Sequence, residues 1–236
     1  SIGAQLIAQE SLEIILKDSS TLKLTSLKVD VKIVGNFATT TYDMKFYNEL
    51  DRTLEGELVF PLGQGQAVSR FSIDVNDKLR EAVIVEKELA RVAFESTVRQ
   101  NIDPGLLEKT EGNNYKARIY PILPKKHKHI VLTFEQELST LNQFQTYVLP
   151  LGIKEALDDF LVNIEVLEGQ GLPKIKSNTY ENFFFKEDKG VFKTSLKKQN
   201  HSPTNPIIFQ IPNGIGKDKV LSYSDYFYVY QTLKPN

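Results

Sequence analysis

Hydrophobic and polar residues alternate with a period of two along three stretches of the chain, residues 27–33, 42–46 and 130–134. Side chains of a strand point alternately to its two faces, so each stretch predicts a strand with one buried and one wetter face. Short segments rich in Gly, Asn, Asp and Pro separate the alternating stretches. Strands at this spacing are typical of an antiparallel β-sandwich or barrel.

One segment follows a helical period instead. Residues 86–99 contain no Gly or Pro, and a helical wheel places Ala90, Ala93 and Phe94 on one side and most of the charged residues on the other. This apolar stripe predicts one helix packed on a sheet, with Phe94 buried. Pro104 would end the helix because proline lacks the N–H that continues it.

The second half of the chain shows a weaker version of the same pattern. A shorter helix is predicted at residues 154–160, and strands are predicted at residues 160–167, 191–196 and 207–211. A polar stretch near residues 138–145 interrupts the alternation between the two halves. We therefore expect a mainly β fold in two units. Residues 1–140 would form an antiparallel β-sandwich with one packed α-helix, and residues 141–236 a second β-rich unit.

Composition narrows the class of protein. The 236 residues are 25% charged and 41% hydrophobic, which is ordinary for a soluble globular chain. The absence of cysteine excludes disulfides, thiolate nucleophiles and cysteine-held metal centres. A net charge of -1 argues against a nucleic-acid binder, and no apolar run has the length of a membrane span. Because the chain starts with Ser1, we expect it to be processed or part of a longer protein.

Short motifs in a fixed order give residues 22–138 a specific resemblance. The motifs are Gly35-Asn36-Phe37-Ala38-Thr39-Thr40, Phe46-Tyr47-Asn48, Leu54-Glu55-Gly56-Glu57-Leu58-Val59-Phe60-Pro61-Leu62, Val85-Glu86-Lys87 through Ala93-Phe94-Glu95, Asp103-Pro104-Gly105-Leu106-Leu107-Glu108, Gly112-Asn113-Asn114-Tyr115 and Arg118-Ile119-Tyr120-Pro121-Ile122, ending with residues 132–137. Together they resemble the vault protein inter-α-trypsin (VIT) domain. The resemblance implies a β-sandwich domain over residues 1–140 with a helix packed on it.

The resemblance also carries expectations about the rest of the protein. A von Willebrand factor A domain with a metal-ion-dependent adhesion site usually follows the VIT domain in this family. The Asp-x-Ser-x-Ser run of that site does not occur in this chain, so its metal chemistry is not carried over. Residues 141–236 loosely resemble the β-rich linking segment that precedes the A domain. The family also implies an extracytoplasmic location and a protein or extracellular-matrix partner, and we expect a monomer.

The basic cluster Lys125, Lys126, His127, Lys128 and His129 is the first candidate site. The two histidines stand two residues apart, so on a strand they share a face. Such a pair could hold a metal, but no carboxylate is near in sequence and three lysines crowd it with positive charge. The same charges could attract an anionic partner such as a polysaccharide or a phospholipid headgroup, or simply keep a turn solvated.

The second candidate site is an aromatic face. Alternation places Tyr226, Tyr228 and Tyr230 on one side of a strand, where they could bind a ligand or pack in a sheet. No acid–base pair is evident, because Asp158 and Asp159 are adjacent and share a face neither on a strand nor on a helix. We therefore expect no catalytic residues, no metal and no cofactor.

Three hypotheses about function follow. The first is a non-enzymatic structural and protein-interaction module that positions a following A domain and contributes to protein or matrix binding. The second is a carbohydrate-binding β-sandwich that uses the C-terminal tyrosines. The third is a hydrolase with scattered carboxylates, which would need a deep pocket where they converge.

Overall fold

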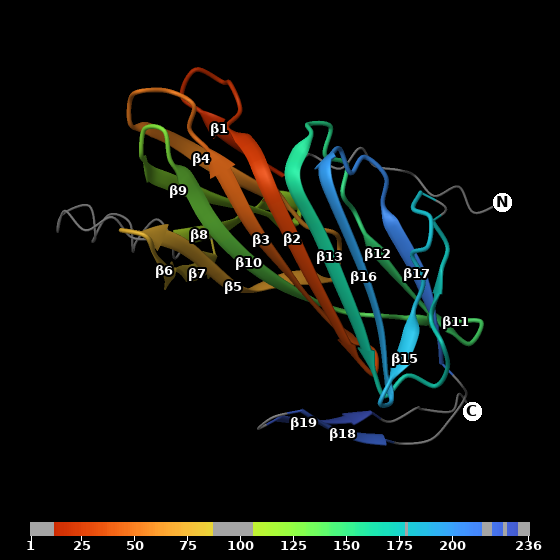
Figure 1. Ribbon diagram of the computed structural model, residues 1–236. Coiled ribbons are helices and arrows are strands. Elements are labelled where there is room, and N and C mark those ends of the chain that lie inside the picture. Colours follow the sequence, from red (N-terminus) through yellow and green to blue (C-terminus); the bar gives the residue numbers. More distant parts are fainter. Residues whose placement is uncertain (1–11, 87–105, 178, 214–218, 224–225, 231–236) are drawn as a thin grey trace.

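The computed structural model describes residues 12–86, 106–177, 179–213, 219–223 and 226–230. Its largest element is an eight-stranded sheet in the order β15-β16-β13-β2-β3-β10-β5-β6. The strands of this sheet are β2 (Lys23–Val34), β3 (Phe37–Tyr47), β5 (Gln66–Val75), β6 (Lys78–Glu81), β10 (His127–Glu137), β13 (Leu157–Leu167), β15 (Lys186–Asp188) and β16 (Val191–His201). Figure 1 shows the long strands side by side.

Two smaller sheets and a hairpin complete the described fold. The five-stranded sheet contains β1 (Glu13–Leu16), β4 (Leu54–Pro61), β9 (Asn114–Ile122), β8 (Leu106–Thr110) and β7 (Val83–Glu86), in that order. The four-stranded sheet contains β11 (Thr140–Leu141), β12 (Phe144–Leu149), β17 (Ile207–Pro212) and β14 (Lys174–Ile175). A separate pair joins β18 (Lys219–Tyr223) to β19 (Tyr226–Tyr230). The short 3₁₀ turn η1 (Glu111–Asn113) lies between β8 and β9.

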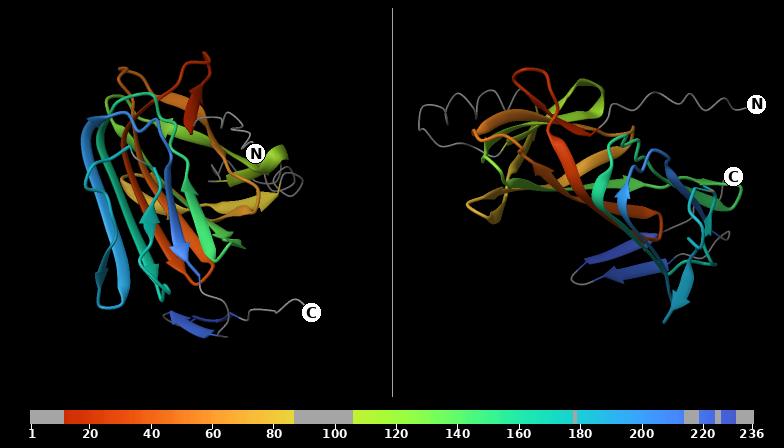
Figure 2. Two further views of the ribbon diagram at one scale, coloured as in Figure 1. Left: turned by 90° about the vertical axis from the view of Figure 1, so that its right-hand side faces the viewer. Right: turned by 45° about the horizontal axis from the view of Figure 1, so that its top comes forward.

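Both smaller sheets pack on the same face of the large sheet (Figure 2). Tyr42 on β3 contacts Phe60 on β4, with ring centroids 5.4 Å apart, and its hydroxyl donates to the Pro150 carbonyl at 3.1 Å. Its neighbour on that face, Thr40, shares a 2.6 Å hydrogen bond with Tyr147 on β12. The buried side chains of all three sheets therefore form one continuous core.

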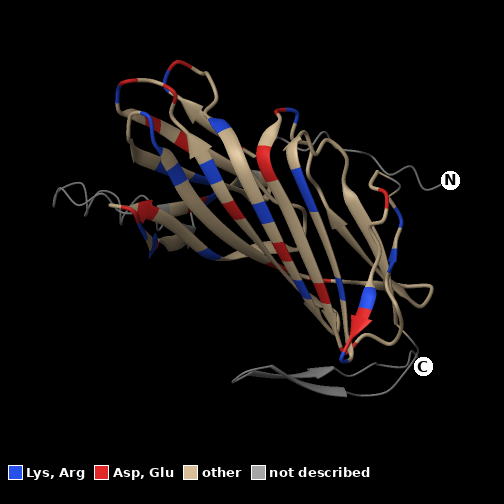
Figure 3. Ribbon diagram, viewed as in Figure 1, with Lys and Arg blue, Asp and Glu red and all other residues tan. Residues whose placement is uncertain are grey.

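Alternation assigns the two faces of the large sheet as expected. Leu27, Val29, Val31 and Ile33 of β2 are buried, while the intervening polar residues reach the opposite face. Lys, Arg, Asp and Glu recur along that opposite face (Figure 3). The prediction of a mainly β fold built of alternating strands is therefore confirmed.

The helical predictions are not supported. Glu86, the first residue of the predicted helix at 86–99, is the last residue of β7, and residues 87–99 lie outside the described part of the chain. The shorter helix predicted at 154–160 is wrong, because β13 begins at Leu157. There the chain gains ladder hydrogen bonds from β2 and β16 on both sides, which outweigh a weak local helical preference. Within the described residues, no helix is long and apolar enough to cross a membrane.

The predicted boundary near residues 138–145 does not separate the strands into different sheets. β13, which follows the boundary, pairs in parallel with β2, which precedes it, from Asp159 beside Ser26 to Leu167 beside Val34. Strands from both sides of the boundary therefore belong to one sheet. Whether residues 1–140 and 141–236 fold as separate units stays a prediction.

Candidate functional site

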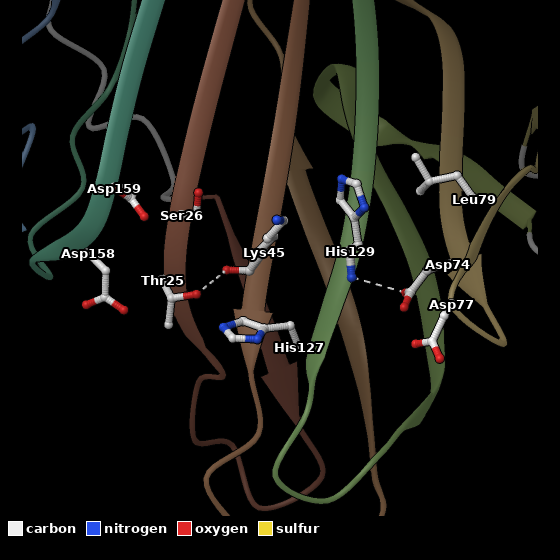
Figure 4. Close-up of a pocket in the computed structure, with 10 residues that line it drawn as sticks. All are labelled: Thr25, Ser26, Lys45, Asp74, Asp77, Leu79, His127, His129, Asp158 and Asp159. Carbon is white, nitrogen blue, oxygen red and sulfur yellow. Dashed lines mark hydrogen bonds between the residues drawn. The ribbon is translucent and has the colours of Figure 1, made fainter. Parts of the chain in front are cut away.

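A groove of about 660 Å³ crosses one end of the polar face of the eight-stranded sheet (Figure 4). It is formed by β13, β2, β3, β10, β5 and β6 with the turn between β5 and β6. Its lining residues are Thr25, Ser26, Lys45, Asp74, Asp77, Leu79, His127, His129, Asp158 and Asp159. Both histidines of the basic cluster and both adjacent aspartates thus lie at one site.

Strand register explains why residues so distant in sequence meet here. Asp159 pairs with Ser26, Ser26 with Lys45, and Lys45 with His129. Paired residues of neighbouring strands point to the same face, so these four side chains form a row across the sheet. The row extends to β5, where Asp74 accepts the backbone N–H of His129 at 3.0 Å. Across the sheet, the row therefore contains a carboxylate, a hydroxyl, an ammonium, an imidazole and a second carboxylate.

His129 is held on both sides. Its Nε2 lies 2.7 Å from Asp43 Oδ1, and its backbone amide is bound by Asp74. Asp43 lies far away in sequence, so the expectation that no carboxylate is near the histidine pair holds in sequence but not in space. A fixed imidazole–carboxylate pair orients the ring and leaves Nδ1 as its second polar atom.

His127 is exposed and packs its ring against Tyr47, with the ring centroids 4.9 Å apart. The histidines share one face of β10, as the spacing predicts, because both line the groove. Among the described residues, no group of three or more His, Cys, Asp or Glu is arranged to hold a metal ion.

Lys128 does not belong to a surface cluster. It points to the other face of β10, with a side chain that is 6% exposed. Its ammonium donates to the carbonyl oxygens of Asp74 and Pro121 at 2.7 and 3.1 Å and lies 3.4 Å from Asp74 Oδ1. The suggestion that Lys128 binds an anionic partner is therefore wrong, because strand alternation turns it inward, where protein oxygens bind its ammonium.

The remaining lysines of the cluster lie on the turn before β10. Lys125 has a positive φ of 52°, and its Nζ donates to the Glu49 carbonyl at 2.6 Å and lies 3.7 Å from Asp51. Lys126 is exposed. The fold therefore splits the five-residue cluster into a turn with two lysines, a groove with two histidines and one buried lysine. Binding of an anion by Lys125 and Lys126 stays a prediction.

The C-terminal tyrosines lie on β19. Tyr226, Tyr228 and Tyr230 pair through the backbone with Tyr223, Leu221 and Lys219 of β18. The structure does not describe the surroundings of these side chains, so an aromatic binding face there stays a prediction.

A second groove, of about 650 Å³, was missed by the sequence reasoning. It lies over β2, β13 and β16, beside β15, and contains an exposed Phe184 whose ring lies 5.3 Å from Lys186 Nζ. Asn163 donates to Asp30 and accepts from Ser195, each at 2.8 Å. The available signal was Asn163, an amide at a polar position of β13.

Comparison with known proteins supports the resemblance found in the sequence. Residues 24–134 match the vault protein inter-alpha-trypsin domain. A von Willebrand factor A domain-containing protein of Dictyostelium discoideum is 26% identical over 140 residues, covering 57% of this chain and 15% of that protein. Inter-alpha-trypsin inhibitor heavy chain H3 of Homo sapiens is 21% identical over 197 residues, covering 78% of this chain and 22% of its own. The chain thus spans less than a quarter of either relative.

A solved structure shares the fold. A candidate nutrient binding protein of Legionella pneumophila aligns over 88% of this chain and 71% of its own, with a TM-score of 0.52 and 14% sequence identity. At this identity the likeness concerns the arrangement of strands alone. The alignment extends well beyond residues 24–134, so the shared architecture includes strands that follow the matched domain.

Proposed function

Because residues 24–134 are a VIT domain, we propose that the chain is a non-enzymatic structural and protein-interaction module that positions a following A domain and contributes to binding a protein or matrix partner. Its relatives include an A domain-containing protein and an inter-alpha-trypsin inhibitor heavy chain. The proposed setting is extracytoplasmic, the proposed state is a monomer, and the proposed partner is not a nucleic acid, in keeping with the net charge of -1.

The parallel ladder between β2 and β13 is the observation that carries this proposal. It joins the VIT domain to the segment that follows, from Ser26 beside Asp159 to Val34 beside Leu167. A sheet with a common core resists bending far better than a linker does. A module attached after this segment would therefore take its orientation from the VIT domain.

Hydrogen bonds between the sheets reinforce the same frame. The Tyr147 and Thr40 hydroxyls bind each other in the core, and the Tyr42 hydroxyl binds the Pro150 carbonyl. Each bond joins the VIT domain to the following segment. Buried polar contacts of this kind favour one packing arrangement because an alternative arrangement would leave the groups unpaired.

The charged side chains in the groove of Figure 4 have structural roles. His129 and Asp74 are the obvious candidates for acid–base chemistry there. His129 Nε2 is bound to Asp43, and Asp74 Oδ1 accepts the His129 amide. These contacts give both groups a structural use in holding β3, β10 and β5 together.

The test measures the orientation of the A domain in the full-length gene product. Residual dipolar couplings should give one alignment tensor for β2, β13 and the A domain. A variant with a flexible Gly/Ser insertion after Asn236 is the matched control, and it should uncouple the A domain. An A domain that tumbles independently in the natural protein would contradict the positioning role, and so would a gene product without an A domain.

Carbohydrate binding is the second candidate function, and the Phe184 groove favours it. Phe184 is 54% exposed. In the same groove, Asn163 forms hydrogen bonds with Asp30 and Ser195. An aromatic ring beside oriented polar groups suits the apolar faces and hydroxyls of a sugar ring. Glycan-array binding that is lost in Phe184→Ala would support this function. Equal binding by the variant, or none by either protein, would contradict it.

A further inference from the structure

β12 is paired unequally on its two sides. On one side it pairs with β17 along its whole length, from Phe144 beside Pro212 to Leu149 beside Ile207. On the other side β11 covers only its first two residues, with Leu141 beside Phe144 and Thr140 beside Gln145. Among the described strands, none pairs with residues 146–149 on that second side. We call this stretch the open edge of β12.

The register shows which backbone groups face the open edge. The Asn213 amide donates to the Gln143 carbonyl at 2.8 Å, so odd-numbered residues of β12 exchange their hydrogen bonds with β17. The backbone groups of Thr146 and Val148 therefore point the other way. The position of Pro212 is consistent with this register. Pro212 has no N–H, and it lies beside Phe144, where the β12–β17 ladder requires no N–H from β17.

The open edge also lacks the charged residues that protect other sheet edges in this protein. The edge strands β6 and β15 of the large sheet read KLRE and KED, and all their residues are exposed. In contrast, residues 138–153 contain no charged residue. Leu141, Phe144 and Val148 are 69%, 40% and 43% exposed. An uncharged edge with exposed apolar residues is the kind that pairs with a further strand.

We propose that the open edge of β12 binds an extended segment of a protein partner, which adds to the four-stranded sheet as a strand in line with β11. This inference rests on the proposed protein-interaction role and names its mode. The backbone of Thr146 and Val148 offers two donors and two acceptors, so the partner must be an extended chain. Apolar side chains at alternate positions of the partner would cover Phe144 and Val148.

A second copy of this chain does not fit the same edge in the antiparallel register centred on Tyr147. Antiparallel pairing of two β12 strands about Tyr147 would place Thr146 beside Val148 of the other copy. The same register places Leu149 of the other copy beside Gln145, where Thr140 of β11 already lies. The two copies would collide with each other's β11, whereas a free peptide segment can end before it.

Amide hydrogen exchange on the chain, with and without an acetylated and amidated peptide of sequence KTVTVTVK, tests the proposal. The peptide alternates β-branched residues and carries terminal lysines for solubility. In its presence the exchange rates of the Thr146 and Val148 amides should fall by about tenfold or more. The amides of Tyr147 and Leu149 bond to β17 already and should not change.

Two variants and a matched control make the test specific. Thr146→Pro removes an N–H from the open edge while leaving the β17 ladder intact. Val148→Lys adds a charged side chain to the edge, like those on β6 and β15. This variant replaces Thr146→Pro in the test if the proline variant does not fold. Thr146→Pro should abolish the protection of the Val148 amide, and Val148→Lys should abolish the protection of the Thr146 amide. Ile208→Lys places the same charge beside Val148 on β17, one strand away from the edge, and should keep it.

Three results would overturn the proposal. The first is unchanged exchange of Thr146 and Val148 at saturating peptide. The second is equal protection in wild type and Val148→Lys. The third is protection that rises with protein concentration without peptide, together with a dimer in sedimentation, which would assign the edge to a second copy. None of these measurements depends on an A domain. Strand binding at the open edge and positioning of an A domain can therefore be refuted independently of each other.

Discussion

The neighbouring strands β2 and β13, one before and one after residues 138–145, acquire their pairing partners in different ways. In the earlier segment, β2 and β3 follow each other in the chain and pair as a hairpin. In the later segment, β13 finds its partners at long range, pairing with β2 on one side and with β16 on the other. The position of β13 therefore depends on a sheet that the earlier strands have begun. The matched VIT domain ends at residue 134, but the sheet to which it belongs does not.

Ending the chain at residue 140 should produce the largest effect. β2 would lose its β13 neighbour, and the core would lose Tyr147, Phe160 and Phe209, all fully buried. We expect residues 1–140 alone to show no cooperative thermal unfolding, measured by circular dichroism and calorimetry. The full chain is the control. Cooperative unfolding of the fragment near the melting temperature of the full chain would instead support two independent units.

Phe160→Ala should have the next largest effect. Phe160 is fully buried on β13, beside Leu27 of β2, so it lies where the two segments join. Loss of its ring should lower the free energy of unfolding by about 3–5 kcal/mol in urea titrations. Leu161→Ala is the matched control, because Leu161 is half-buried on the polar face and should cost clearly less. Equal losses of unfolding free energy in the two variants would mean that Phe160 is not packed between β13 and the core as described.

Tyr147→Phe should have a smaller effect. The substitution removes one hydroxyl and leaves the Thr40 hydroxyl, which is fully buried, without its 2.6 Å partner. An unsatisfied buried hydroxyl costs about 1–3 kcal/mol. The double variant with Thr40→Val, which removes both hydroxyls, should recover part of this loss in the same urea titration. A double variant less stable than either single variant would contradict a specific coupling between the two groups.

The alkaline pH dependence of stability should show the smallest effect. Burial raises the pKa of Tyr147 above its usual value, and the Thr40 hydrogen bond offsets this in part. A phenol with a raised folded-state pKa contributes stability that is complete below the unfolded pKa of about 10 and declines as the pH rises above it. Wild type should therefore lose stability more steeply than Tyr147→Phe above that pH. Parallel curves would show that Tyr147 is not shielded from water.

The basic cluster shows where sequence reasoning about the site succeeded and failed. The two-residue spacing of His127 and His129 was enough to place both on one face of β10. It should also have separated Lys128 from them, because the intervening residue of a strand points the opposite way. Asp43 and Asp74 could not be assigned to the histidines from sequence, since register across strands decides that contact.

Two features could be predicted from the sequence alone: which residues of β2, β3 and β10 are buried, and the resemblance of residues 24–134 to the VIT domain. Alternation and motif order are local properties, and each strand keeps its two faces whatever its neighbours are. Three outcomes depended on the tertiary structure: residues 157–159 extend the predicted strand and do not form a helix, this strand adjoins β2, and protein oxygens bind the Lys128 ammonium. Those outcomes depend on pairing and packing between distant residues, whose free energy exceeds the local preference of a short segment.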